Sequence, residues 1–338
     1  MTDLRKPSSG AADLAGRSVL ITGGLGFIGS TLARRCLDLG AAVTVYDSLD
    51  PNSGGNLYNI AGVEAALRLV RADILDFTEV CRAVTGQDIL FNCAASTSHP
   101  FSMREPWVNL NVNSKGVINL LEAARRFNPG MRFTQLGTST QLGPLRYRPA
   151  DENHPEFPTD MYSANKSVSE KYVLIYGRAY GMPVTVVRLP NVYGPRASIH
   201  SPEFTFVNYF IGQALQQRSI SIYGDGRQLR NLLYVDDAAE ALTASASQDA
   251  ALGQVLFAAG DQHLPVVDIA RTIAEVFGSP APSLVPWPAE RRAIEVGDAV
   301  ISNARIKSLL GWAPRIDFAE GARATRDYYR QCLNHYLR

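Results

Sequence analysis

The sequence predicts an α/β fold, a Rossmann-type doubly wound parallel sheet joined to a smaller mixed α/β domain. Three observations predict it. A glycine-rich turn within residues 17–35 joins an apolar strand to a helix. Short apolar strands then alternate with long helical patterns as far as residue 189, which is typical of a parallel sheet covered by helices on both faces. After Pro190 this alternation is lost and proline becomes frequent, as expected of a smaller second domain.

The first strand and the turn after it predict a dinucleotide site. Val19–Ile21 is apolar, too short for a helix and bounded by glycine, so we expect a buried strand. Gly23, Gly26 and Gly29 follow, and the apolar residues after them recur at helical spacing. In such a turn the first glycine allows a tight bend, the second lets a pyrophosphate approach the backbone, and the third lets helix and strand pack closely. The helix N-terminus adds free N–H groups and a partial positive charge for the phosphates.

The second strand indicates which dinucleotide binds. Residues 42–46 have the alternating pattern of a strand, which ends at Asp47, 18 positions after Gly29. A carboxylate at this place accepts hydrogen bonds from both ribose hydroxyls of adenosine and repels a 2′-phosphate. No arginine follows directly, since the chain continues with Ser48, Leu49 and Asp50. We therefore expect NAD rather than NADP.

The later strands predict the rest of the sheet and the chain's division into domains. We expect strands at 67–70, 88–95, 131–136 and 184–189, long helices at 108–127 and 161–180, and a return to the main sheet at 232–236. The fourth strand ends in Ala94 and Ala95, whose small side chains let a cofactor lie against the backbone. The predicted domains are 16–188 with 232–258 for NAD, and 189–231 with 259–331 for the substrate. Residues 1–15 are polar and small and predict a disordered tail.

Composition excludes several classes of protein. The chain has 338 residues, a net charge of +1, 46% hydrophobic residues and 19% charged residues, so it can bury a large core. This balance gives no electrostatic reason to bind nucleic acid or a membrane surface. Residues 1–15 contain no apolar stretch, so we expect them not to act as a signal peptide, and no apolar run approaches the roughly 20 residues of a membrane span. The four cysteines are widely spaced, which favours reduced thiols in a cytoplasmic protein, and no cluster has metal-ligand spacing.

Tyr162 and Lys166 are candidate catalytic residues. Their i,i+4 spacing places both on one face of the predicted helix 161–180. The pKa of a free phenol is near ~10, and a neighbouring ammonium or a positive nicotinamide ring would lower it. Tyr162 could then exchange a proton with a substrate hydroxyl. Such a pair also arises by chance on exposed helices, but Thr138 ends the fifth strand at the sheet edge where these folds bind ligands.

Together these motifs resemble the extended short-chain dehydrogenase/reductases, in particular the nucleotide-sugar epimerase/dehydratase family. The resemblance covers nearly all of residues 17–331. It rests on these segments: TGGLGFIG at 22–29, the Thr138 strand end, YSANK at 162–166, RLPNVYGPR at 188–196, IYGDGRQLR at 222–230 with YVDD at 234–237, ERRAIEVGD at 290–298 and LGWAP at 310–314. One departure stands after the threonine, where the family's usual Val-Tyr-Gly reads Gln141-Leu142-Gly143.

The resemblance implies an enzyme that oxidises a sugar at C4, keeps NADH bound and returns the hydride. Dehydratases of the family place Asp-Glu directly after the threonine, and decarboxylases of UDP-glucuronate place Glu two positions after it. Here those positions are Ser139 and Thr140, so we expect an NAD-dependent 4-epimerase. We lean to the UDP-glucuronate/UDP-galacturonate pair, because hydroxyl groups can hold a carboxylate that a Glu would repel. UDP-glucose/UDP-galactose is the alternative, followed by decarboxylase and 4,6-dehydratase activity.

The remaining expectations concern individual residues, assembly and a competing class. By resemblance Asn191 contacts the sugar nucleotide and Arg230 grips the diphosphate, while Asn113 is structural; His99, a loop histidine, receives no metal role. The chain is expected to form a homodimer through the helices near 108–127 and 161–180. The competing class is an NAD-bound scaffold without catalysis. The candidate residues are Thr138, Tyr162 and Lys166 for catalysis; Gly23, Gly26, Phe27, Ile28, Gly29, Asp47, Asp73, Ile74, Ala94, Ala95, Tyr162 and Lys166 for NAD; and Ser139, Thr140, Asn191, Arg196, Arg230, Arg291 and Asp298 for a UDP-sugar.

Overall fold

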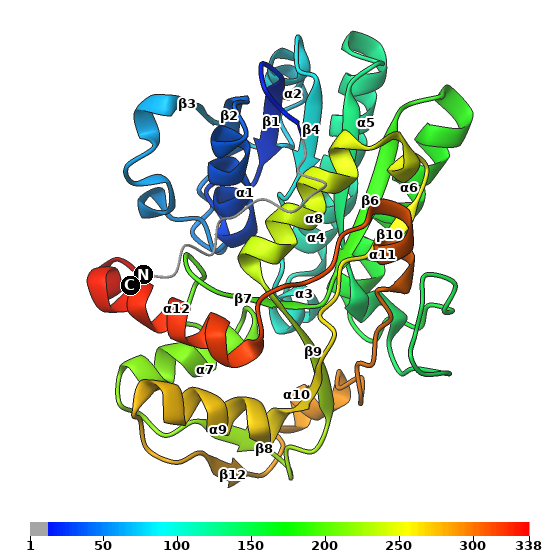
Figure 1. Cartoon of the computed structure of the whole chain (residues 1–338). Helices are drawn as coiled ribbons and strands as arrows, with labels where there is room; N and C mark the ends of the chain where they lie inside the picture. The colour runs from blue at the N-terminus through cyan, green and yellow to red at the C-terminus, as the bar shows by residue number, and fades with distance from the viewer. Residues whose placement is uncertain (1–12, 338) are drawn as a thin grey trace.

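Seven parallel strands form the main sheet of the molecule. The computed structural model describes residues 13–337. The strands lie in the order β10–β6–β5–β4–β1–β2–β3, and every neighbouring pair is parallel (Figure 1). The predicted fold class is therefore confirmed. The strands are β1 (Ser18–Thr22), β2 (Ala42–Asp47), β3 (Leu67–Arg71), β4 (Ile89–Asn92), β5 (Arg132–Thr138), β6 (Val184–Leu189) and β10 (Val255–Phe257).

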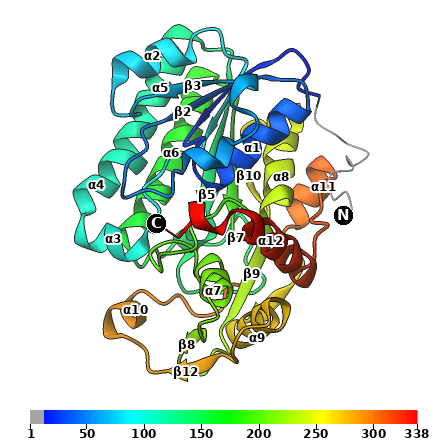
Figure 2. The same ribbon diagram turned by 90° about the vertical axis from the view of Figure 1, so that its left-hand side faces the viewer.

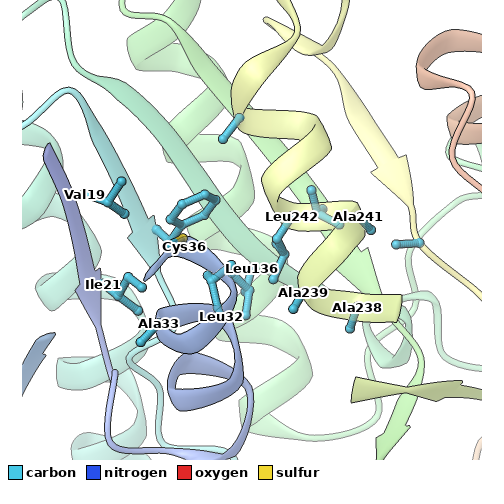
Figure 3. Packing of buried hydrophobic residues seen from close by; sticks show 14 of the residues in the cluster. Val19, Ile21, Leu32, Ala33, Cys36, Leu136, Ala238, Ala239, Ala241 and Leu242 are labelled. Atoms are coloured by element: carbon cyan, nitrogen blue, oxygen red, sulfur yellow. The ribbon is translucent and has the colours of Figure 1, made fainter. Parts of the chain in front are cut away.

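Helices cover both faces of the main sheet (Figures 1 and 2). Successive side chains of a strand point to opposite faces, so Val19 and Ile21 pack on one side and Leu20 on the other. Figure 3 shows the first side, where residues of α1 and α8 meet the strands. The first face carries α1 (Phe27–Asp38), α8 (Val235–Ser247) and α11 (Ala304–Leu310); the second carries α2 (Phe77–Val84), α4 (Pro106–Leu110), α5 (Gly116–Phe127) and α6 (Met161–Tyr180).

The helix predicted at 108–127 has a break near its start. Its first turn belongs to α4, and a π-helical turn at Asn111–Lys115 connects α4 to α5. Asn113 lies in this turn, and its amide bonds both backbone groups of Ser96, with distances of 3.0 Å from Ser96 N and 2.9 Å to Ser96 O. This supports the structural role expected for Asn113, which fixes the loop that leaves β4. The helix predicted at 161–180 is α6.

A small lobe lies beyond the carboxyl ends of the main strands, at the lower end of the molecule in Figure 1. Its core is built mainly from α7, α9 and α12. The expectation that 232–236 returns to the main sheet is wrong for the strand, because β9 pairs with β7 and β11 in a separate sheet. The elements that do return are α8, β10 and also α11, which lies within the predicted substrate segment 259–331. The elements are β7 (Asn191–Tyr193), β8 (Ser221–Tyr223), β9 (Leu229–Tyr234), β11 (His263–Pro265), β12 (Ser283–Val285), α7 (Phe206–Leu215), α9 (Val266–Phe277), α10 (Ala289–Ala293) and α12 (Phe318–Cys332).

The structure describes the N-terminal segment only from residue 13 onward. Most of the predicted tail, residues 1–12, lies outside the described residues, whereas Leu14 is buried in the core of the main sheet. All four cysteines are unpaired in the structure, and Cys36 and Cys332 are buried. Within residues 13–337 no helix combines the length and the hydropathy that a membrane span requires.

A buried ion cluster connects β6 to α6 next to β5. Arg188 Nε donates to Glu170 Oε2 at 2.8 Å, and Arg188 Nη2 donates to Glu170 at 2.6 Å and to Glu156 at 2.8 Å. The amide of Gln141 donates to the same two carboxylates, at 3.1 Å each. Gln141, which departs from the pattern of the family that the sequence resembles, thus adds a neutral donor to this buried pair of acceptors.

Replacing Arg188 with Met should destabilise the protein by about 3–5 kcal/mol, because Glu156 and Glu170 would lose their cation in a buried site. The free energy of unfolding in urea measures the effect. Arg271→Ala is the matched control, since Arg271 pairs with Asp268 on the surface and such pairs contribute about 0–1 kcal/mol. An equal loss of unfolding free energy in both variants would show that the buried cluster does not stabilise the fold.

Candidate active site

A large cavity lies at the carboxyl edge of the main sheet and reaches the small lobe. Its volume is about 800 Å³, and its walls come from the ends of β1, β2, β4 and β5, from α6, and from β7, β8 and α10. The order in which strands are added reverses here. From β1 the chain adds β2 and β3 on one side, and it then adds β4, β5 and β6 on the other side. Ligands of doubly wound sheets bind at such a reversal.

The glycine turn at this edge fits a dinucleotide. Gly23 has a φ of +65°, and a Cβ there would lie 2.7 Å from Ala94 N at the end of β4. A Cβ on Gly29 would lie 2.2 Å from Gly23 O, so only glycine lets α1 approach the turn this closely. Gly26 is the N-cap of α1, and neither a side-chain cap nor an acidic residue in the first turn competes for the free N–H groups.

Asp47 is buried in the cavity wall with both carboxylate oxygens oriented by the backbone. Leu25 N donates to Oδ2 at 3.0 Å and Leu49 N donates to Oδ1 at 2.8 Å. Burial raises the pKa of Asp47, and these two hydrogen bonds oppose the shift. Each oxygen retains a lone pair for a further donor, so the carboxylate can accept the two hydroxyls of a ribose.

The cavity brings together nearly all the residues predicted from the sequence. Its lining residues include Gly23, Gly26, Phe27, Ile28, Gly29, Asp47, Asp73, Ile74, Ala94, Ala95, Thr138, Ser139, Thr140, Tyr162, Lys166, Asn191, Arg230, Arg291 and Asp298. These positions span more than 270 residues of sequence.

Arg196 is the exception, and its assignment to the substrate is corrected. The side chain does not line the cavity; its Nε donates to Thr31 Oγ1 on α1 at 3.1 Å, and its guanidinium lies over the Tyr328 ring of α12 at 5.7 Å. Arg196 has a φ of +72°, which turns the chain sharply after Pro195. The side chain therefore leaves the substrate side and joins the main sheet's helix to the C-terminal helix.

Thr138, Tyr162 and Lys166 meet where β5 ends and α6 begins. Burial raises the pKa of Tyr162 to about 12; a hydrogen bond with Thr138 lowers it, and the Asp160 charge raises it. Burial also lowers the pKa of Lys166 to about 8, and its Nζ donates to Leu136 O at 2.5 Å. The expected lowering of the Tyr162 pKa by Lys166 is therefore not found, because the ammonium is directed to a backbone carbonyl.

A chain of hydroxyls extends from Thr138 to the start of α6. Thr138 Oγ1 and Thr140 Oγ1 are 3.0 Å apart, and Ser163 Oγ donates to Thr140 Oγ1 at 2.9 Å or to Asp160 Oδ2 at 3.1 Å. Asp160 caps α6 by accepting from Ser163 N at 2.8 Å. Burial raises the pKa of Asp160, but bonds and charge from His99 together with the Ser163 bonds outweigh it, so the net shift is downward.

The small lobe contributes a charged and an aromatic wall. Arg230 is held by Glu295 at 2.6 Å and by Gly297 O at 2.6 Å. Asp298 accepts from Leu229 N at 2.8 Å, and the Tyr223 and Trp287 rings lie 5.4 Å apart on the same wall. Sequence reasoning missed this aromatic pair, because the two residues are far apart along the chain and join through the pairing of β8 with β12.

His99 is a second residue whose place the sequence did not predict. It lines the cavity, its Nδ1 is 2.7 Å from Asp160 Oδ2, and its ring meets the Tyr162 ring edge-on at 4.8 Å. The partner carboxylate stands 61 residues further along the chain. Only half of the signal was present in the sequence: Asp160 directly precedes the predicted helix 161–180, whereas His99 was expected in a loop and is the first residue of a helix that was not predicted.

A parallel dinucleotide-binding sheet with a Tyr-x-x-x-Lys helix beside its fifth strand defines the class of extended short-chain dehydrogenase/reductases. Within it, residues 19–257 match the model of the NAD-dependent epimerase/dehydratase family. The chain belongs to this family, and NAD is its cofactor.

Relatives in the family differ in activity. A dTDP-glucose 4,6-dehydratase from Actinoplanes sp. is 31% identical over 92% of this chain and 97% of its own. A UDP-glucose 4-epimerase from Mycolicibacterium smegmatis is 31% identical over 92% of this chain and 98% of its own. The structure of Thermus thermophilus UDP-glucose 4-epimerase in complex with NAD aligns with a TM-score of 0.83 at 29% identity, covering 93% and 99%.

The geometry of Asp47 predicts a cofactor preference. NAD should bind at least about tenfold more tightly than NADP, which corresponds to ~1.4 kcal/mol, because a 2′-phosphate would meet a carboxylate. Asp47→Asn keeps the size and an acceptor oxygen but removes the charge, so the preference should shrink. Titration calorimetry with both dinucleotides measures it. Asp38→Asn, an exposed change at the far end of α1, should leave the preference intact. Equal affinities in the unmodified protein would overturn the role of Asp47.

Proposed function

We propose that this protein is an NAD-dependent nucleotide-sugar 4-epimerase. The observation that carries the proposal is the composition of the sugar end of the cavity. Thr138, Tyr162 and Lys166 stand together, while the positions that hold acids in dehydratases and decarboxylases are the hydroxyl residues Ser139 and Thr140. The competing scaffold without catalysis is disfavoured, because all three catalytic candidates lie in one cavity.

Relatives alone do not separate the epimerase from the dehydratase, since one of each is 31% identical to this chain. The local carboxylates favour the epimerase. Asp160 is the carboxylate next to the Thr140 hydroxyl, and its oxygens are engaged by Ser163 and His99. It stabilises the start of α6 in this position and is not free to donate a proton to a leaving hydroxyl at C6.

The proposed chemistry needs one acid–base group at the C4 oxygen. When bound, NAD would supply a reversible acceptor for the C4 hydride, and the positive charge of its oxidised ring would favour the phenolate form of Tyr162. Tyr162 accepts the hydroxyl proton of the substrate and gives it back. Thr138 donates to the same oxygen, where negative charge develops. Lys166 lines the cavity and donates to Leu136 O, and it would donate to a ribose hydroxyl of the bound cofactor.

The other end of the cavity suits a nucleoside diphosphate. Arg230 and Arg291 offer guanidinium groups to the two phosphates. Asn191 and Asp298 offer an amide and a carboxylate to hydroxyl or ring N–H groups, and the Tyr223–Trp287 wall offers an apolar face to a base. We propose UDP because relatives of this chain are named as acting on UDP-sugars. Reduced cysteines favour a cytoplasmic enzyme.

For the sugar we favour the UDP-glucuronate/UDP-galacturonate pair. Ser139 and Thr140 supply neutral donors at the sugar end, and a Glu there would repel a carboxylate. A 4-keto uronate is a β-keto acid that loses CO₂ readily, so the enzyme has to hold the carboxylate without an acid nearby. UDP-glucose/UDP-galactose is the second candidate, because the same hydroxyls can bind a hydroxymethyl group.

Turnover of purified protein with each UDP-sugar tests the proposal. We expect interconversion of UDP-glucuronate and UDP-galacturonate, detected by chromatography, to exceed that of the neutral pair at matched concentration. Tyr162→Phe should reduce turnover to near background while thermal unfolding is unchanged, because only the titrating hydroxyl is removed. Preference for UDP-glucose would overturn the uronate assignment and leave the 4-epimerase intact. A 4-keto-6-deoxy sugar, or CO₂ with UDP-xylose, would instead identify a dehydratase or a decarboxylase.

We further propose that the protein is a homodimer through α4 and α6. Trp107 on α4 is 75% exposed, and Val168 and Ile175 lie seven residues apart on one exposed face of α6. Trp107→Glu should shift the dimer toward monomer in light scattering at micromolar concentration, because a charge would be buried in the interface. Leu284→Glu on β12, also an exposed apolar side chain, is the control and should remain dimeric. A monomeric unmodified protein would overturn the proposal.

A further inference from the structure

His99 and Asp160 form a pair within the active site that the proposed 4-epimerisation does not use. His99 is the first residue of α3 (His99–Arg104), and Asp160 is the N-cap of α6. The Asp160 side chain is 2% exposed and the His99 side chain is 31% exposed, and both line the cavity. The carboxylate is thus buried behind the imidazole, and the imidazole faces the space that a ligand can enter.

The position of His99 is fixed by bonds between α3 and α6. Ser102 Oγ donates to His99 O at 2.7 Å and accepts from Tyr162 N at 3.1 Å. The imidazole therefore stands directly beside the catalytic phenol, with ring centroids 4.8 Å apart and an interplanar angle of 76°. In a substrate whose C4 hydroxyl meets the Tyr162 oxygen, the carbons next to C4 are C3 and C5. The one that lies on the His99 side of the phenol is the one that the imidazole can reach.

Asp160 determines which nitrogen of His99 carries the proton. Ser163 donates to the carboxylate from its backbone and its hydroxyl, which favours the ionised form. An ionised carboxylate can only accept, so His99 Nδ1 is the donor, and whenever the ring is neutral its Nε2 holds a lone pair. Among the described residues none forms a hydrogen bond with Nε2. A buried carboxylate that orients an imidazole and stabilises its cation is the arrangement of a general base.

We propose that His99, oriented by Asp160, is a second acid–base residue that exchanges hydrogen at a carbon next to the C4 ketone. This rests on the proposed function, since the ketone arises by oxidation at C4. In 4-epimerisation the one oxygen-bound proton is handled by Tyr162, so the dyad has no task in that reaction. A ketone makes the hydrogens on its neighbouring carbons acidic, and a neutral imidazole is a base suited to remove one near neutral pH.

The step balances within the site. His99 Nε2 takes a proton from the carbon, the electrons of that C–H bond form a C=C bond to C4, and the C=O electron pair moves to the C4 oxygen. Tyr162 and Thr138 donate hydrogen bonds to this oxygen, and Asp160 stabilises the imidazolium. The reverse step returns a proton to the carbon. Between the two steps the imidazolium can exchange its Nε2 proton with water, so the carbon acquires solvent hydrogen.

The alternative is that the pair only fastens α3 to α6. His99→Gln separates the two readings, because the Gln amide is long enough to donate to Asp160 and cannot titrate. A fastening role predicts unchanged catalysis in this variant. An acid–base role predicts a loss of hydrogen exchange while oxidation at C4 continues.

The experiment is turnover in D₂O with the substrate that the unmodified enzyme accepts. Mass spectrometry counts deuterium in the recovered nucleotide sugar, and proton NMR locates it at C3 or C5. Absorbance of the reduced nicotinamide follows oxidation at C4 separately. We expect deuterium at one carbon with the unmodified enzyme, incorporation slower by about 10²-fold or more in His99→Gln, and slower incorporation in Asp160→Asn. His200→Gln, which changes an exposed histidine outside the cavity wall, is the control.

The outcomes distinguish this proposal from the proposed function. Turnover without deuterium in the unmodified enzyme, or equal incorporation in His99→Gln, would overturn the role of His99 and leave the 4-epimerase intact. Neither turnover nor nicotinamide reduction with any nucleotide sugar would overturn both. A readout without substrate is ¹⁵N NMR of histidine-labelled protein: the signal lost in His99→Gln should report protonated Nδ1 and bare Nε2, and the opposite tautomer would contradict the proposal.

Discussion

The close approach of the first turn to the end of β4 is the constraint on which the site depends. At Gly23 there is no room for a Cβ, since it would lie 2.7 Å from the Ala94 backbone. Two strands that are neighbours in space but about 70 residues apart in sequence are thereby brought together at the edge where α1 begins. The same contact fixes where the loop after β4 starts, and this loop leads through Ser96 to His99 at the start of α3, beside the Tyr162 ring.

From this loop, a series of buried hydrogen bonds fixes the positions of α3, α4 and α6 relative to one another. Asn113 and Asn109 both donate to Ser96 O, and Asn165 on α6 donates to Asn109. Buried amides tolerate few arrangements, because each unmade hydrogen bond costs about 1–3 kcal/mol. The π-helical turn that interrupts the predicted long helix lies in this line. Tyr162 thus owes its position as much to these amides as to its own helix.

The sequence predicted features that depend on neighbouring residues. Apolar runs ended by glycine located the strands of the main sheet, and the Tyr162–Lys166 spacing located α6, because these signals are local. It did not predict that β9 leaves the main sheet, since strand pairing is decided by distant partners. The position of Arg196 outside the cavity wall, and the meeting of His99 with Asp160, are likewise properties of the folded chain and have no local pattern.

The buried carboxylate of Asp160 limits how this active site can be converted to another activity of the family. The hydroxyl of Thr140 reaches this buried carboxylate through Ser163 alone. An acid grafted at position 140, as in relatives that decarboxylate or dehydrate, would stand beside a second negative charge in a dry environment, where one of the two must take up a proton. The choice of hydroxyls at 139 and 140 and the choice of Asp at 160 are therefore coupled. Redirecting this active site requires changing the two places together, and a graft of either place alone meets electrostatic resistance.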